Sequence, residues 1–434
     1  MNLVSLLIIL LAITITYWKP SAGLVVAANA PIIRRTLTIY TGTENEDILL
    51  SLLLPIVVFL IILIRAFKNL SYYRIHHLDI LFILLGIWFL ISSLIASDIF
   101  RGVEITFRYF VLGISFYFCA RLIPLINMRI LNKNLSLLAL STWISAFLVA
   151  IISLYQGIYN GFNVDRLTIG TANPIPVSLL LSMGLIVNAY WLTIDSRANF
   201  ILRFFNCLGI PILGMALIAN KTRSVIIALV LSFIFIILTS KYRNSLIKYL
   251  AKIIIIIMTL AIVFYLLSHW QPEIFSSWMQ RFSRLQDTNT DISGSKRISL
   301  YGYALYLFSQ NILFGVGTAN FGVVSKTAAY PHNLVLEIAS EQGTFGLIIL
   351  SLIIFTITGI LGRRENNIYK YPIKNLFSAW IILNFTVAQF SLTLWQHKNL
   401  FLTLGLLVSV HQYYSTISQT NIHKMVEIKK NIYF

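Results

Sequence analysis

Long apolar runs, separated by short polar segments, occupy most of the chain up to about residue 416. A helix needs roughly 17 to 25 consecutive, mostly apolar residues to cross the hydrocarbon core of a bilayer. The pattern therefore predicts an all-α integral membrane protein with about twelve transmembrane helices. The predicted spans are residues 3–18, 47–64, 80–97, 107–125, 135–158, 176–194, 200–219, 225–240, 253–270, 344–362, 376–395 and 399–416.

Composition agrees with this pattern and excludes a soluble domain. Of the 434 residues, 58% are hydrophobic and only 11% are charged, which is far from the usage of soluble proteins. The formal charge of +18 raises the question of a nucleic-acid partner. The basic residues, however, stand in short clusters between apolar runs, as the positive-inside rule produces. We therefore predict a lipid bilayer as the surroundings and no nucleic-acid partner.

The same basic residues predict the orientation of the spans. With both termini placed inside, the inner segments carry 19 basic and 4 acidic residues, and the outer segments keep the other 14 basic and 11 acidic residues. The excess on the inner side supports this orientation over its inverse. We also expect the first apolar run to stay in the mature protein as a span instead of being removed as a signal peptide.

Two outer segments are longer than simple connections, residues 19–46 and about 271–343. The second contains "KRISLYGYALYLFSQ", a helical pattern with Ile298, Tyr301, Leu305 and Phe308 on one face. We predict three regions: residues 1–270 with nine spans, a large outer loop at 271–343, and residues 344–434 with three spans and a basic tail. The polar stretch 286–295 is expected to be a linker.

The densest acid–base chemistry lies in "PHNLVLEIASEQGTFG", residues 331–346, directly before a predicted span. Pro331 suits the first turn of a helix, and a histidine beside the positive end of the helix dipole is kept neutral, as a general base must be. A helical phase of 100° per residue gathers the polar side chains on one half, which we expect to face water or charge. A catalytic helix and a merely hydrated interfacial helix are both compatible with this pattern. The polar residues on that half are His332, Asn333, Glu337, Ser340 and Glu341.

A second constellation, "NKTRSV", opens the predicted span at residues 225–240 from its outer side. Lys221 and Arg223 would meet the free N–H groups of a helix N-terminus, with Thr222 or Ser224 as the cap. Such a set suits a diphosphate. The alternative is two basic side chains snorkelling at the membrane interface.

Two further outer segments carry arginines. Arg166 follows Asp165 in "VDRLTIGTANP", where a local ion pair is the simpler interpretation. Arg297 is expected to begin the helix of the large outer loop, and Gly315 and Gly317 follow in a loop that can approach a ligand closely. We find no spacing of zinc ligands and no nucleotide-binding motif, so we expect neither metal nor cofactor.

The order of these motifs resembles the O-antigen ligase and O-antigen polymerase superfamily, which are bacterial membrane glycosyltransferases of the GT-C kind. The resemblance covers the twelve-span layout and, at motif level, about residues 166–346, and "ANPIP" at 172–176 departs from the usual pattern. The matching positions are Arg166, Arg223, Arg297, Gly315, Gly317, Phe321, His332, Asn333, Glu337, Glu341, Gly343 and Gly346.

The resemblance implies an undecaprenyl-diphosphate-linked glycan as donor, used at the periplasmic face of the inner membrane. It implies His332 as the base, Arg223 as the diphosphate ligand and Glu337 as the residue that orients His332. The other substrate-binding residues that it implies are Arg166, Lys221, Arg297, Asn333 and Glu341.

The reaction class has alternatives. We expect a polymerase, which extends a lipid-linked repeat unit, and keep as alternatives a ligase, which transfers glycan to the lipid A core, and a transporter or flippase. A chain-length regulator or a flippase is a further expected partner. The repeat unit, its linkage and the oligomeric state cannot be read from these residues.

Overall fold

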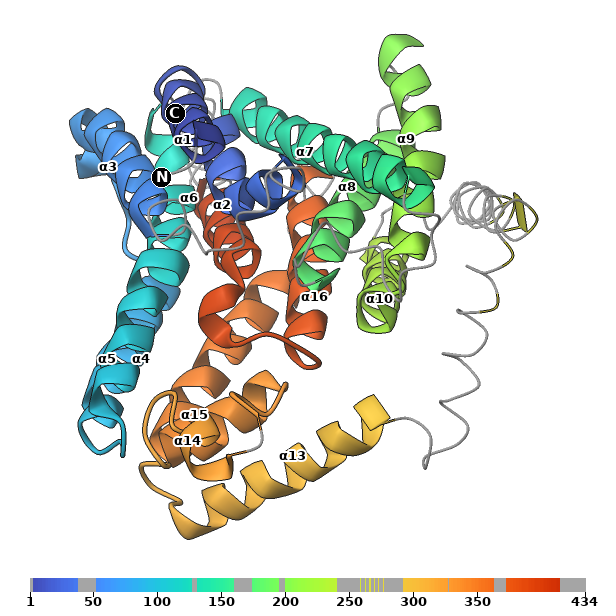
Figure 1. The fold of residues 1–434 in the computed structure, drawn as a ribbon. Coiled ribbons are helices and arrows are strands. Elements are labelled where there is room, and N and C mark those ends of the chain that lie inside the picture. The colour runs from blue at the N-terminus through green and yellow to red at the C-terminus, as the bar shows by residue number, and fades with distance from the viewer. Residues whose placement is uncertain are drawn as a thin grey trace, which may run out of the picture.

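The computed structural model describes residues 3–37, 52–126, 131–159, 174–194, 200–239, 292–326, 328–362 and 372–413, together with seven single positions between 258 and 276. In these ranges the chain forms helices and loops and no β-strand (Figure 1). The larger helices are α1 (Leu3–Trp18), α2 (Pro20–Leu37), α3 (Leu54–Ala66), α4 (His77–Leu94), α5 (Ile99–Arg108), α6 (Ser115–Ile126), α7 (Leu131–Tyr159), α8 (Pro174–Ile194), α9 (Phe200–Ala219), α10 (Arg223–Thr239), α13 (Ile292–Gln310), α14 (Phe321–Ser325), α15 (Leu334–Gly362) and α16 (Pro372–Ala388), followed by a helix at 398–413. Shorter segments are η2 (Phe67–Tyr72), η3 (Tyr109–Ile114) and η7 (Leu394–Gln396).

The predicted all-helical membrane architecture is confirmed at the level of helices long and apolar enough to cross a bilayer. Within the described ranges, six segments meet that length and composition, and four shorter helices are also apolar. The predicted total of twelve spans includes residues 253–270, most of which lie outside the described residues. The six segments are Leu54–Tyr72, His77–Leu94, Ile99–Ile126, Lys133–Gly157, Pro174–Trp191 and Leu334–Gly362.

Helix α4 shows how such a helix meets lipid. Its outward side chains are apolar and recur every three or four residues, as Ile80, Ile83, Leu84, Ile87, Leu90, Ile91 and Leu94. Its other face packs into the protein through Phe82, Leu85 and Phe89, among others. A helix that is apolar on both its buried and its exposed side is typical of a membrane span.

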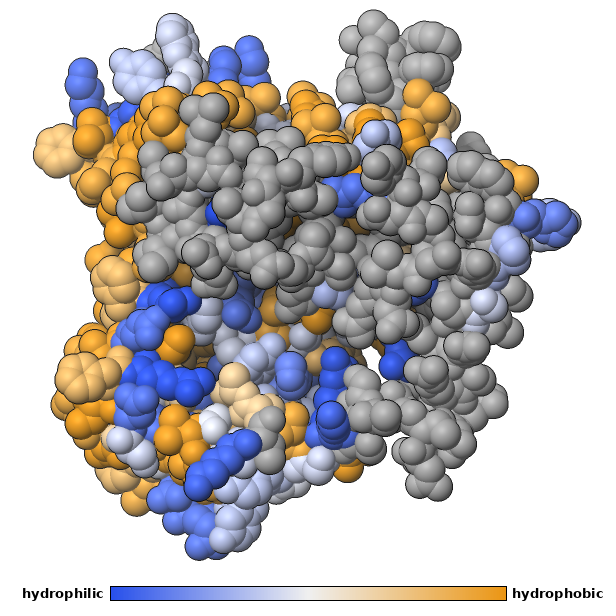
Figure 2. All heavy atoms as spheres, viewed as in Figure 1, coloured by the Kyte–Doolittle hydropathy of each residue, from blue (hydrophilic) through white to orange (hydrophobic). Residues whose placement is uncertain are grey.

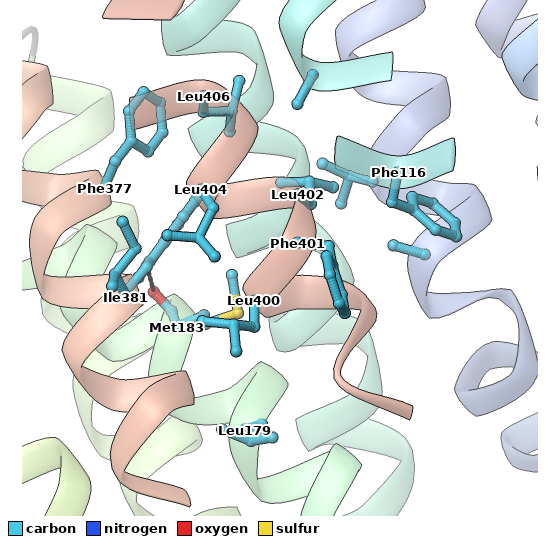
Figure 3. Packing of buried hydrophobic residues seen from close by; sticks show 14 of the residues in the cluster. Phe116, Leu179, Met183, Phe377, Ile381, Leu400, Phe401, Leu402, Leu404 and Leu406 are labelled. Atoms are coloured by element: carbon cyan, nitrogen blue, oxygen red, sulfur yellow. Dashed lines mark hydrogen bonds between the residues drawn. The ribbon is translucent and has the colours of Figure 1, made fainter. Parts of the chain in front are cut away.

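The interior is a continuous apolar core. Its centre lies where α8, α16 and the helix at 398–413 meet (Figure 3). There Met183, Ile381 and Leu400 pack against one another, and the Trp380 indole N–H donates to the carbonyl of Met183 at 3.2 Å. This packing ties the last two helices of the chain to α8.

The N-terminal region differs from the prediction. Instead of a single outer loop at 19–46, the chain turns at Lys19 and forms a second helix, α2, with Pro20 at its first position. The Arg65 guanidinium donates to the carbonyl of Tyr17, so α1 and α3 end at the same end of the bundle. The predicted layout, in contrast, places the C-terminal ends of these two spans on opposite sides of the membrane.

An ion pair is buried near the start of α4. Arg121, only 4% exposed, donates through Nε and Nη2 to both carboxylate oxygens of Asp79, at 2.9 and 3.0 Å. The hydroxyls of Tyr117 and Tyr73 donate to the same carboxylate at 2.6 and 2.8 Å, and so does the backbone N–H of His76 at 2.9 Å. Arg121 therefore joins α6 to α4 inside the protein.

The large outer loop contains α13, which lies across one end of the bundle, beside α14 and the first half of α15 (Figure 1). The helix begins at Ile292, earlier than predicted, so four residues of the expected linker are helical. Its buried side consists of Ala304 and Leu307, whereas Ile298 and Leu305 are 69% and 54% exposed. The residues at helical spacing therefore do not mark the buried side, because the apolar residues of α13 recur on two sides and only packing against Phe321 selects one.

Candidate functional site

The site is built around a break in α15. Gly343 has φ 65° and ψ −159°, so the helix is interrupted there and continues in a new direction as the predicted span. The interruption removes the helical donors for the carbonyls of residues 340–342. Each of these carbonyls instead receives an outside donor: Val316 N–H at 2.9 Å, Gly317 N–H at 3.0 Å and the Trp88 indole at 3.1 Å.

Residues 311–322, here called the docking loop, supply two of those donors. The loop approaches so closely that a Cβ on Gly315 would overlap the backbone of Glu341, and Gly315 and Gly317 both have positive φ angles. Thr344 N–H donates back to Ile312 O at 2.8 Å. The glycines were predicted to allow close approach, and the structure shows that they approach the broken helix.

Glu341 fastens the docking loop. Its two carboxylate oxygens accept from the backbone N–H groups of Ala319 and Phe321, at 2.8 and 3.2 Å. The side chain is 6% exposed. The structure thus gives Glu341 a loop-binding role. Glu337, Ser340 and Glu341 are buried, on the half of the helix that was predicted to face water or charge.

The start of α15 also differs from the prediction. The helix begins at Leu334, not at Pro331, and Asn333 caps it: Oδ1 accepts from Leu336 N–H at 3.0 Å. His332 precedes the cap with a left-handed φ of 59°. The amide Nδ2 of Asn333 donates to Gln389 O at 3.2 Å, so both ends of this side chain hold structure.

A second loop meets this segment and was missed from the sequence. Residues 389–397, here called the site loop, connect α16 to the helix at 398–413. Its Leu394 backbone N–H is hydrogen-bonded to the carboxylate of Glu337, a residue only 8% exposed, while Oε2 of Glu337 has no partner. Most of the site loop, residues 389–395, was predicted as the end of the span at 376–395, whereas α16 ends at Ala388. Its one buried histidine, His397, lies between that predicted span and the next.

His332 stands half-buried between these elements. Its ring lies 4.3 Å from the ring of Tyr330, measured between centroids, and its Nδ1 is buried without a hydrogen-bond partner. No hydrogen bond joins Glu337 to it. Burial, and secondarily the charge of Arg297 on α13, hold the pKa of His332 below its ordinary value of 6.5. The imidazole is therefore neutral at neutral pH and can accept a proton.

The basic residues of the second constellation lie at the start of α10. The helix begins at Arg223, two residues before the predicted span, and Thr222 Oγ1 donates to Ser178 Oγ at 2.5 Å. Lys221 is 3% exposed with φ 54°, and Arg223 is half-buried. Because α10 packs along α16, which leads into the site loop, this segment and His332 belong to connected elements. Arg166 lies outside the described residues.

Helix α5 brings further charged residues that the sequence did not single out. Arg108 pairs with Glu104 at 2.6 Å and lies 5.1 Å above the ring of Trp395 in the site loop. Asp98 and Arg101 stand at its start, where the backbone N–H of Asp98 donates to Asn320 of the docking loop at 3.0 Å. Hydrophilic residues gather over this end of the molecule, from α5 to α13, and the surface is recessed between the two (Figure 2).

The break at Gly343 can be tested directly. Gly343→Ala would force a left-handed φ on an alanine and overlap its Cβ with Leu313 O, so we expect a loss of about 1 to 3 kcal/mol or more in folding free energy. The matched control is Gly359→Ala, in the same helix, where nothing lies within 4 Å of the added Cβ. Thermal unfolding in detergent should show a lower midpoint for Gly343→Ala alone. Equal midpoints would show that the break is not required.

The candidate site contains His332, which is half-buried and neutral, and Glu337, whose buried carboxylate has one oxygen without a hydrogen-bond partner. Arginines lie on neighbouring helices. Such a set can remove a proton from a hydroxyl and bind an anion. Among known protein families, residues 208–351 match one described as O-antigen ligase, from α9 through the docking loop to the second half of α15. No curated protein matches the chain.

Proposed function

We propose that this chain is a membrane glycosyltransferase of the O-antigen ligase and polymerase superfamily, because residues 208–351 match the family described as O-antigen ligase. In this proposal it moves an undecaprenyl-diphosphate-linked oligosaccharide onto a sugar hydroxyl at the periplasmic face of the inner membrane. The observation that carries the proposal is His332, held neutral and half-buried at one end of the helix bundle.

In the proposed reaction the imidazole of His332 takes the proton of the acceptor hydroxyl as its oxygen attacks the anomeric carbon. The bond between that carbon and the diphosphate oxygen breaks, and the diphosphate leaves with the electron pair. Glu337 accepts from Leu394 N–H of the site loop, so we propose that it orients His332 indirectly, by holding this loop against the segment that carries the histidine.

The leaving diphosphate needs cations. Arg223 offers a planar fork that binds two phosphate oxygens, with Lys221 beside it in sequence and Arg166 as a further proposed ligand. Arg297 acts electrostatically on His332 and Tyr330, and we propose that it closes the donor site from α13. Asn333 and Glu341 support the site through their backbone hydrogen bonds instead of binding glycan directly.

Arg223 offers a test of the diphosphate assignment. We expect Arg223→Ala to lower the transfer rate by about 10² to 10³, as for other groups that stabilise developing charge. Arg223→Lys should restore only part of it, because the charge remains and the fork is lost. Initial rates with purified protein measure both. An alanine variant with the wild-type rate would remove Arg223 from the site.

We further propose that the enzyme is a polymerase, whose acceptor is another lipid-linked repeat unit, because the superfamily contains many variants for different repeat units. Purified protein would be given a polyprenyl-diphosphate oligosaccharide without any core acceptor. Chain growth supports the polymerase. Growth only after lipid A core is added indicates the ligase, and no transfer with either acceptor contradicts both. In a deletion strain, core with a single repeat indicates a lost polymerase, and bare core indicates a lost ligase.

A further inference from the structure

The Nδ1 atom of His332 lacks the hydrogen bond that usually orients a catalytic imidazole. Catalytic and metal-binding histidines commonly fix one ring nitrogen through a carboxylate or a carbonyl. Here Nδ1 is buried and has no partner, and the backbone of His332 is left-handed at φ 59°. A non-glycine residue in that region costs about 1 to 3 kcal/mol and persists only where its surroundings enforce it.

Tyr330 is the side chain that packs on the imidazole. The two rings lie 4.3 Å apart between centroids at an interplanar angle of 53°. The hydroxyl of Tyr330 is hydrogen-bonded to the side chain of Ser391 and to the backbone of Leu392, both in the site loop. The site loop thereby fixes the hydroxyl end of Tyr330, and the ring of Tyr330 can hold His332 in place.

The site loop is itself firmly built. His397, 2% exposed, places its Nε2 3.1 Å from Ser391 O, and burial lowers the pKa of His397 to about 4, so this ring is neutral and Nε2–H donates. Gln396 Oε1 accepts from the backbone N–H of Thr393 at 3.3 Å and so closes the turn of η7. Leu392 adopts a left-handed φ of 68° within this frame.

Three residues of the segment around His332 contact this loop. Tyr330 reaches Ser391 and Leu392, Asn333 donates to Gln389 O, and Glu337 accepts from Leu394 N–H. The histidine lies between the first two of them and makes no such contact through Nδ1. The loop therefore fixes the residues on both sides of His332, while the ring itself depends on Tyr330.

We propose that Tyr330 is a positioning residue for His332, and that the site loop, through the Tyr330 hydroxyl, sets the orientation and the dry surroundings of that imidazole. The proposal rests on the proposed glycosyl transfer with His332 as base. Tyr330 touches neither reacting atom; it acts through the ring that does. This assigns a function to residues 389–397, which lie outside the matched family region.

The titratable and charged groups that act on His332 or on the ring packed against it come from three elements. Tyr330 of its own segment contacts His332, Arg297 in α13 acts on both residues, and Glu337 in α15 acts on Tyr330. Removal of the Tyr330 ring leaves all the other groups in place and exposes the imidazole to water. Since burial is the main cause that lowers the pKa of His332, that pKa should then rise toward 6.5.

The test uses full-length protein in lipid nanodiscs and a polyprenyl-diphosphate oligosaccharide as substrate, with rates measured from pH 5 to 8. For Tyr330→Ala we expect kcat to fall about 10- to 100-fold with little change in KM, as misplacement of a reacting group does. The acid limb of its pH–rate profile, where activity is lost on protonation of His332, should move to higher pH. For Tyr330→Phe, which keeps the ring and loses the anchor, we expect a fall in kcat of several-fold and an unmoved limb.

The matched control is Tyr303→Phe. Tyr303 also donates its hydroxyl to a backbone carbonyl, Val324 O at 3.3 Å, and contacts an aromatic ring, but on α13 away from the site loop. This control should keep the wild-type rate and acid limb. Thermal unfolding of each variant shows whether it is folded.

The outcomes are separable. If Tyr330→Ala is folded and slower at every pH with an unmoved acid limb, its role is structural and the proposal is overturned. If the alanine variant does not fold, Tyr330→Phe decides, and a wild-type kcat overturns the proposal. If His332→Ala transfers glycan as the wild type does, the proposed base itself fails, independently of Tyr330.

Discussion

We expect replacement of His332 by alanine to abolish the proposed glycan transfer and to leave a folded, membrane-inserted protein. His332 is the proposed general base, half-buried and neutral. Loss of a general base typically costs about 10² to 10⁴ in rate. The side chain makes no hydrogen bond through Nδ1, so its removal takes away little stability.

The measurement is the initial rate of transfer with purified protein, beside thermal unfolding in the same detergent. The matched control is His77→Ala, an exposed histidine at the start of α4 and far along the chain from the site. The control should behave as the wild type. Wild-type products from His332→Ala would refute the assignment of the base.

The pH dependence of the wild type follows from the same residue. The pKa of His332 is lowered by burial and by the charge of Arg297, and the neutral imidazole is the active form. Activity should therefore be retained at pH 6.5 and be lost only as pH falls through the lowered pKa. An acid limb above pH 6.5 would contradict the neutral, half-buried histidine.

Replacement of Asp79 by alanine strongly destabilises the protein. Arg121 would remain buried at 4% exposure, without the carboxylate that accepts from its Nε and Nη2. A buried guanidinium cannot neutralise itself by losing a proton, and an uncompensated buried charge costs about 3 to 5 kcal/mol. We expect a large drop in the thermal unfolding midpoint and in the amount of inserted protein.

Two further variants sharpen this prediction. Arg121→Met should cost less than Asp79→Ala, because the remaining carboxylate keeps the hydroxyls of Tyr117 and Tyr73 as donors and can be protonated. The double variant Asp79→Leu with Arg121→Leu should recover stability relative to Asp79→Ala, since no charge is left buried.

A control is Glu104→Ala, which removes an exposed partner of Arg108 and should change the midpoint little. If Asp79→Ala matched Glu104→Ala, the buried pair would not contribute to folding.

Local signals in the sequence predicted the all-helical membrane class, because apolar runs and basic clusters are properties of neighbouring residues. The glycines at 315 and 317 indicated a close approach of the backbone, and "PHN" indicated a histidine near a helix start. These signals did not predict which side of α13 packs or which residues are buried in α15.

The sequence by itself determined the class of the protein, since length and apolarity suffice for a helix to prefer a bilayer, and it determined which residue types can carry acid–base chemistry. Only the tertiary structure decided what each of them does. The break at Gly343 frees carbonyls that must find donors, which draws the docking loop to α15 and turns Glu341 inward. The site loop then meets His332 from about 60 residues further along the chain. That contact exists through packing of distant segments, and no local pattern of residues encodes it.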